Sequence, residues 1–219
     1  MLPVSLEQAR TILCLGAHAD DIEIGCGGAL IGLLSRQRQA IDVHWVVFSA
    51  AEERRREALH SAERFLADAR TKSVTIHDFR DTCFPFAGEE IKARFQELRD
   101  RLSPDLIFTH RREDVHQDHR LLAELTWCAF RDHLILEYEI PKYEGDLGHP
   151  NIFVPVGELV GRRKVETLLE MFPTQRSKPW FTADTFWALM RLRGLECNSP
   201  TRFAEAFTCG KLVVAVQGA

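Results

Sequence analysis

The sequence predicts an α/β protein with a doubly wound, mainly parallel sheet and helices on both faces of that sheet. Short apolar segments rich in β-branched residues alternate with longer segments of helical periodicity, an order typical of parallel sheets. A length of 219 residues suits one domain with its own core, and no repeat, low-complexity tract or linker interrupts the chain. We therefore expect a single domain over residues 1–219.

The first strand and the first helix are separated by a polar turn. Residues 11–17 are apolar and partly β-branched, as expected of a buried strand, and the strand ends at His-Ala-Asp-Asp, residues 18–21. Gly-Cys-Gly-Gly at 25–28 then leads into a helical pattern over 29–34. The glycines lack the full dinucleotide or phosphate-loop pattern and follow three carboxylates. We expect them to let the helix pack close to the strands, not to bind a nucleotide.

The alternation continues to the middle of the chain. Apolar runs predict three further strands, at 42–48, 73–78 and 105–109. Apolar residues at helical spacing predict the helices between and after them, at 52–69, 89–102 and 119–130. Together with the first strand and helix, these elements predict a Rossmann-like fold.

The second half of the chain is less regular. We expect strands at 134–140 and 151–156, because both runs are apolar and rich in Ile, Leu, Val, Phe or Tyr. Helices are expected at 158–172 and 183–193, followed by a last strand at 211–216.

Composition and charge exclude several classes of protein. The chain holds 28 Lys and Arg against 32 Asp and Glu, a net charge of −4, which argues against a nucleic-acid binder that relies on general basic attraction. No uncharged apolar run of about eighteen residues is present, so we expect no membrane-spanning segment. The six cysteines form no C-x-x-C pair and no signal-peptide pattern opens the chain, which favours a reducing cytoplasm over three disulfides.

Histidines and aspartates gather after two of the predicted strands. The carboxyl ends of parallel strands meet at one edge of the sheet, so these side chains should lie together: His18, Asp20, Asp21, His110, Asp114, His116, Asp118 and His119. Three His or Asp ligands with one open position describe a catalytic Zn²⁺ site, which activates water and polarises a carbonyl. A spare carboxylate and a spare histidine would serve as base and oxyanion partner.

Other interpretations of the same residues remain open. Asp-Asp after a strand is often only a turn and a helix cap, and a lone histidine is usually structural. Two histidines and one carboxylate also form the site of non-haem Fe(II) oxygenases, although those usually occur on β-barrels. A non-catalytic sugar-binding or regulatory protein is a third possibility. We assign no catalytic role to the other histidines, at 44, 60, 77, 133 and 149.

The motifs resemble those of the PIG-L/LmbE-like family, zinc-dependent de-N-acetylases that act on N-acetylglucosamine-type sugars and related amides. The matching segments are His-Ala-Asp-Asp at 18–21, Gly-Cys-Gly-Gly at 25–28, Arg-x-x-Glu at 54–57, Arg-Asp at 80–81, His-x-Asp-His at 116–119 and the closing segment 193–207. The likeness covers nearly the whole chain. It implies a small-molecule N-acetyl sugar or glycoconjugate as substrate and Zn²⁺ as cofactor, with Fe²⁺ and other divalent metals compatible.

The resemblance also implies the metal ligands and the base. His18, Asp21 and His119 match the family's metal ligands. Asp20 matches the general base that takes a proton from the metal-bound water. Attack of that water on the amide would then release acetate and a free amine.

Four further residues match supporting positions. His116 matches the residue that, as an imidazolium, stabilises the oxyanion and protonates the leaving amine, and Asp118 would orient a histidine. Arg54 and Asp81 match substrate-contacting positions. The alternative for Arg54 is a solvated charge on its helix.

Several positions depart from the family pattern. Ala19 replaces a proline, the 49–52 loop is short, and Phe172 stands where the family's His-x-Ser-Gln has its histidine. The polar stretch 136–146 is expected to line the sugar pocket, with a plain sheet edge as the alternative. Four aromatic residues would supply either the interface of a homo-oligomer or core packing: Trp180, Phe181, Phe186 and Trp187.

Overall fold

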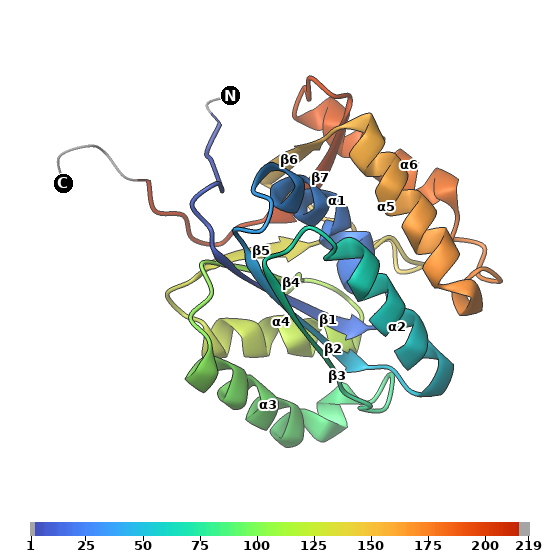
Figure 1. The fold of residues 1–219 in the computed structure, drawn as a ribbon. Helices are drawn as coiled ribbons and strands as arrows, with labels where there is room; N and C mark the ends of the chain where they lie inside the picture. The colour runs from blue at the N-terminus through green and yellow to red at the C-terminus, as the bar shows by residue number, and fades with distance from the viewer. Residues whose placement is uncertain (1–2, 215–219) are drawn as a thin grey trace.

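A computed structural model describes residues 3–214, and its strands form one seven-stranded sheet (Figure 1). The strands are β1 (Thr11–His18), β2 (Asp42–Ser49), β3 (Thr71–Ile76), β4 (Leu106–His110), β5 (Leu134–Tyr138), β6 (Ile152–Val156) and β7 (Phe203–Thr208). They lie in the order β3-β2-β1-β4-β5-β7-β6. The first five are mutually parallel, and β7 runs antiparallel to both β5 and β6. The prediction of a mainly parallel sheet is confirmed.

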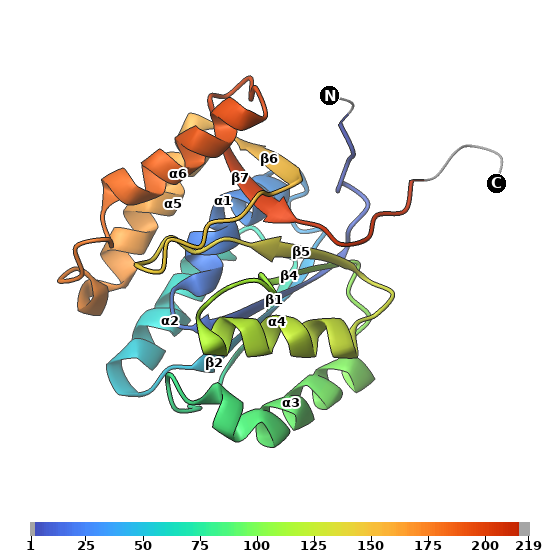
Figure 2. The same cartoon turned by 180° about the vertical axis from the view of Figure 1, so that it is seen from behind.

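Helices cover both faces of the sheet, as Figures 1 and 2 show. The helices are α1 (Asp21–Arg36), α2 (Glu52–Phe65), α3 (Gly88–Arg101), α4 (Gln117–Ala129), α5 (Glu158–Met171) and α6 (Ala183–Glu196), with two short 3-10 turns, η1 (Phe84–Ala87) and η2 (Pro173–Gln175). Helices α3 and α4 pack on one face over Phe48 and Phe95, and the other four pack on the opposite face over Trp45 and Phe65. The doubly wound architecture is thus confirmed.

Helix α1 begins at Asp21, directly after the first polar turn, so the expected start at residue 29 is wrong. The glycines lie inside the helix because its surface meets large buried side chains there. A Cβ at Gly25 would overlap the ring of Tyr138, and one at Gly27 would overlap the ring of Phe65. The expectation that these glycines permit close packing is confirmed.

A buried ion pair meets the middle of α1. Glu205 of β7 accepts hydrogen bonds from the backbone N–H groups of Gly28 and Ala29, and Lys164 of α5 donates to the carbonyl of Ile24 and to Glu205. In a regular helix the N–H of residue 28 would bond to the carbonyl of residue 24. The Lys164–Glu205 ion pair therefore hydrogen-bonds to both groups of that helical position, the N–H of Gly28 and the carbonyl of Ile24, and links α1 to β7 and α5.

The last predicted strand, at 211–216, is wrong. Residues 203–208 form β7, where the buried sequence Ala-Glu-Ala-Phe pairs with β5 and β6. Residues 211–214 have no regular structure, and 215 and 216 lie outside the described residues. The other elements begin and end within a few residues of their expected bounds. Within residues 3–214, no helix is long and apolar enough to cross a membrane.

Candidate active site

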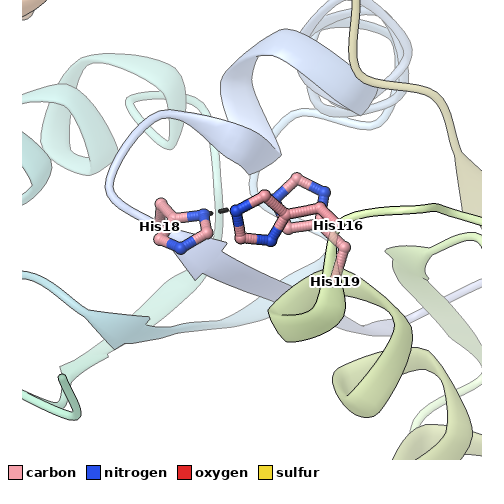
Figure 3. A group of neighbouring side chains, drawn as sticks. All are labelled: His18, His116 and His119. Atoms are coloured by element: carbon pink, nitrogen blue, oxygen red, sulfur yellow. Dashed lines mark hydrogen bonds between the residues drawn. The ribbon is translucent and has the colours of Figure 1, made fainter. Parts of the chain in front are cut away.

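The two predicted motifs meet at the carboxyl ends of the adjacent strands β1 and β4. His18 is the last residue of β1 and Asp21 the first of α1, while His116 caps the N-terminus of α4 and His119 lies in its first turn. Figure 3 shows the three imidazole rings facing one another, although about a hundred residues separate His18 from the other two. They come together because β1 and β4 are adjacent parallel strands, whose carboxyl ends lie at the same edge of the sheet.

Three of these side chains present their ligand atoms to a common point. His18 Nδ1 lies 3.2 Å from His119 Nε2 and 3.3 Å from Asp21 Oδ2. His119 Nε2 lies 3.5 Å from the same Asp21 oxygen. Metal–ligand bonds of about 2.0–2.1 Å in a tetrahedron require ligand atoms roughly 3.3 Å apart. The triangle therefore fits a tetrahedral metal ion with one open position.

Carboxylates behind the two histidines set which nitrogen faces that point. His18 Nε2 lies 2.9 Å from Asp81 Oδ1 and 3.3 Å from Asp118 Oδ2. His119 Nδ1 lies 3.1 Å from Asp114 Oδ2. With both rings neutral and a hydrogen on each of these nitrogens, the lone pairs of His18 Nδ1 and His119 Nε2 would face the point beside Asp21, where a metal ion could bind them.

Asp21 and His18 hold each other in their charged forms. Burial opposes ionisation of His18, yet hydrogen bonds to Asp118 and Asp21 raise its pKa well above the usual value. Asp21 is buried too, but His119 and His110 hold the pKa of its carboxyl well below the usual range. A divalent cation at this point would replace the proton of His18 and pair with the ionised Asp21 carboxylate. Two histidines and one carboxylate suit Zn²⁺ and Fe²⁺ alike.

Asp118 and Asp81 differ in how firmly they are held. Asp118 is fully buried and accepts hydrogen bonds from the backbone N–H groups of Thr82 and Phe84 as well as approaching His18. Asp118 therefore lies where it could hydrogen-bond to His18 Nε2, the kind of contact that the histidine-orienting role requires. Asp81 contacts the same His18 nitrogen, but its side chain is 67% exposed and lines the adjacent cavity.

Asp20 is buried beside the candidate metal point and pairs with Arg54 of α2. Burial raises the pKa of its carboxyl, and the Arg54 guanidinium, 3.0 Å from Asp20 Oδ1, opposes that rise. Arg54 also approaches Glu57 and Thr174, and its guanidinium lies over the ring of Phe172. With 24% of its side chain exposed, Arg54 is not the freely solvated helix charge considered as an alternative.

His116 lies at the mouth of the site as a neutral imidazole. Its Nδ1 accepts a hydrogen bond from the backbone N–H of Asp118 at 3.3 Å, which leaves the hydrogen on Nε2. Partial burial and the nearby rings of His119 and His18 lower its pKa. The lowered pKa favours the neutral form in the free protein, whereas the resemblance implies an imidazolium during the reaction.

Two residues of the cluster had no individual role in the sequence interpretation. His110 is fully buried, its ring stacks on His119 with centroids 3.9 Å apart, and its Nε2 lies 3.2 Å from Asp21. Asp114 joins His119 to Lys142 of the β5–β6 loop, whose Nζ lies 3.0 Å from Asp114 Oδ2. In the sequence, only their position after β4 indicates that these two residues belong to the site. Asp21 and Lys142, which they also contact, lie far from them in the sequence.

A cavity of about 530 Å³ opens beside the candidate metal point. Residues 140 and 142–144 of the β5–β6 loop line it, so part of the stretch 136–146 faces the cavity, and β5 lies inside the sheet. Trp180 lines it as well, whereas Phe181 and Phe186 are buried in the core. Phe172, which replaces the family's histidine, is completely buried.

Comparisons with known proteins give both sequence and fold relatives. A family model described as "PIG-L: GlcNAc-PI de-N-acetylase" matches residues 13–130. An uncharacterized deacetylase of Escherichia coli K12, YaiS, is 28% identical over 148 residues, which are 63% of this chain and 77% of that protein.

Two solved structures share the fold. N,N'-diacetylchitobiose deacetylase from Pyrococcus horikoshii is 19% identical with a TM-score of 0.67, over 93% of this chain and 84% of that chain. GalB, the 4-carboxy-2-hydroxymuconate hydratase from Pseudomonas putida, is 18% identical with a TM-score of 0.75, over 96% and 100%. At these identities the likeness establishes the fold, and the reaction has to be argued from the site.

Proposed function

The chain belongs to the PIG-L (GlcNAc-PI de-N-acetylase) family of deacetylases, and on that premise we propose that it is a metal-dependent hydrolase that removes an acetyl group from an N-acetylated amino sugar of the N-acetylglucosamine type or a related small-molecule amide. The observation that carries this proposal is the convergence of three ligand atoms at mutual distances of 3.2–3.5 Å beside the buried carboxylate of Asp20. The deacetylase names of its relatives support it.

The proposed metal ligands are His18, Asp21 and His119, and the proposed metal is Zn²⁺. A divalent metal bound there polarises the amide carbonyl and lowers the pKa of a bound water to about 7. The orienting carboxylates Asp118 and Asp114 keep the two histidine lone pairs directed at the metal point. This support is independent of the motif match, because it comes from the hydrogen bonds around the rings.

The protons are assigned to Asp20 and His116. Asp20 takes the proton of the attacking water, and its raised pKa brings it closer to the working pH than an ordinary carboxyl. Neutral His116 would donate a hydrogen bond from Nε2–H to the oxyanion, and the proton that Asp20 took from water would pass to the leaving amine, so that acetate and a free amine are released. Arg54 positions Asp20, and Asp81 lines the cavity where the substrate would lie.

Two further proposals concern the cellular compartment and the oligomeric state of the protein. A reducing cytoplasm is supported by the absence of disulfides among the described residues, where all six cysteines are free. A homo-oligomer would use the half-buried Trp187, because Phe181 and Phe186 are buried in the core.

The test compares the parent with Asp20→Asn for metal content and for acetate release from N-acetyl sugars. We expect the variant to keep its metal and to lose about 10²–10⁴-fold in kcat. Acetate release without any bound metal would contradict the proposal. Sugar binding without acetate release would favour a non-catalytic binding protein, and O₂ consumption with Fe²⁺ would favour an oxygenase.

A further inference from the structure

The segment from Gln175, the last residue of η2, to Trp180 in the loop before α6 supplies one wall of the cavity. Its residues Gln175, Lys178 and Trp180 line the cavity, and buried Phe172 and Phe181 flank the segment. Backbone hydrogen bonds from Lys178 N–H to the Gln175 carbonyl and from Phe181 N–H to the Lys178 carbonyl fix its turns. These hydrogen bonds hold the backbone of the segment in one conformation and so fix the positions from which its side chains extend.

Lys178 differs from the other two cations that line the cavity. Arg54 is bound to Asp20 and Glu57, and Lys142 is bound to Asp114 and Asp146. Among residues 3–214, no carboxylate lies within ion-pairing distance of Lys178, and its ammonium lies 5.6 Å from the centre of the Trp180 ring. Glu144, the exposed acid of the β5–β6 loop, forms no ion pair with it in the described part of the chain.

A buried amide beside this cation also lines the cavity. Gln175 is only 6% exposed, and its amide oxygen has no hydrogen-bond partner in the described residues. Buried polar atoms are rarely left unpaired, so a ligand donor is the expected partner.

We infer that the Gln175–Trp180 segment forms a subsite for an anionic group, a carboxylate or a phosphate, carried by the substrate beside its N-acetylated ring. This inference rests on the proposed function. Lys178 supplies the counter-charge, Trp180 supplies a flat apolar surface for a sugar ring, and Gln175 accepts a hydrogen bond from a hydroxyl or N–H of the substrate. The substrate class is thereby narrowed to anionic N-acetyl amino sugars and their conjugates.

The test measures kcat/KM for acetate release from one neutral and three anionic substrates. N-acetylglucosamine is the neutral reference, its 1-phosphate and 6-phosphate carry phosphate at two positions, and N-acetylmuramic acid carries a carboxylate. We expect at least one anionic sugar to exceed the neutral one by about tenfold, the worth of one charge-assisted contact. Comparing the two sugar phosphates with N-acetylmuramic acid shows whether the subsite prefers a phosphate or a carboxylate.

Substitutions then assign the preference to the segment. Lys178→Met should bring the ratio of anionic to neutral kcat/KM close to one, and Lys178→Arg should retain most of it. Lys92→Met, which removes an exposed lysine of α3 outside the cavity, should keep the parental ratio. No preference for any anionic sugar, or the same preference in Lys178→Met, would overturn the inference.

A binding measurement separates this inference from the proposed function. If the metal-loaded protein releases no acetate from any of the four sugars, the proposed function fails. Equilibrium binding of N-acetylglucosamine 6-phosphate, N-acetylglucosamine 1-phosphate and N-acetylmuramic acid to the parent and to Lys178→Met still tests the subsite. About tenfold weaker binding of one of them to the variant supports it, and equal binding of all three overturns it.

Discussion

Helix α1 carries two buried charged clusters of opposite character. Around its middle, Lys164 and Glu205 satisfy each other and the backbone groups of residues 24, 28 and 29. At its first turn, Asp21 lies 3.3 Å from a ring nitrogen of His18 and 3.5 Å from one of His119.

The contrast separates a structural charge cluster from a candidate ligand site. A cluster that serves only the fold completes its own hydrogen bonds with groups that stay charged or hydrogen-bonded, because a buried charge without a partner is costly. At the first turn of α1 the partners of Asp21 include imidazole nitrogens, which can exchange a proton for a metal ion. Substitutions should therefore separate the two clusters, one through ligand affinity and the other through stability.

The largest expected effect is loss of the metal from His119→Ala. Removing one of three proposed ligands should weaken binding by more than about 100-fold, since even residues behind the ligands are worth 10–100-fold. Metal content after dialysis against a chelator, and titration with Zn²⁺, measure this. Unchanged metal content would contradict the ligand assignment.

The matching change in the other cluster is Lys164→Met. It leaves Glu205 as a buried carboxylate without its cation, so we expect the free energy of unfolding to fall by about 3–5 kcal/mol. Urea unfolding of the metal-free protein measures the loss, and the folded fraction should bind metal nearly as the parent does. The double variant Lys164→Met/Glu205→Gln should recover part of the stability. A larger stability loss in metal-free His119→Ala than in Lys164→Met would break the comparison.

A smaller effect on metal affinity is expected from the carboxylates behind His18. Asp118→Asn removes a fully buried negative acceptor, and we expect metal affinity to fall by about 10–100-fold. Asp81→Asn provides the matched control, because Asp81 contacts the same nitrogen from an exposed position and should cost less. Equal losses in the two variants would show that burial does not set the contribution of these carboxylates.

The smallest expected effect concerns Glu23, in the first turn of α1. Burial raises the pKa of its carboxyl to about 8, and the nearby Ser61 hydroxyl opposes only part of that rise. Above the ordinary value of about 4.5 the unfolded chain loses this proton while the folded protein keeps it, so stability falls as pH rises toward 8.

The slope is about 1.4 kcal/mol for each pH unit in that window. Urea unfolding of the metal-free protein at pH 5 and pH 6 measures it, with Glu23→Gln as the comparison. The variant should lack this part of the slope. Parent and variant with identical slopes would show that Glu23 ionises normally in the folded protein.

The sequence indicated most of the fold because the first half of the chain has strong local signals. Apolar β-branched runs and helical periodicity marked β1 to β4 and α2 to α4 within a few residues. It failed at α1, where glycines suggested a turn, and at β7, where Glu205 stands in the centre of a buried strand. Both errors have one cause, since the glycines and Glu205 are used for packing between elements far apart in sequence.

The candidate site also has features that the sequence predicts and features that only the structure shows. The positions of His18, Asp20, Asp21, His116 and His119 after β1 and β4 follow from the chain order alone. Their tautomers and charge states do not, because these depend on hydrogen-bond distances that the folded chain sets, from His18 to Asp81 and Asp118 and from His119 to Asp114.

The sequence by itself therefore determined the fold class and the family, and it indicated which edge of the sheet would carry the His and Asp residues. The tertiary structure alone decided that Arg54 pairs with Asp20, that the surroundings of His116 lower its pKa, and that Lys178 lines the cavity without an anionic partner in the described residues. The physical reason is the separation along the sequence over which each kind of interaction acts. Periodicity and turn chemistry act between neighbouring residues, whereas ion pairing, burial and pKa depend on distances that exist only after the loops are packed together.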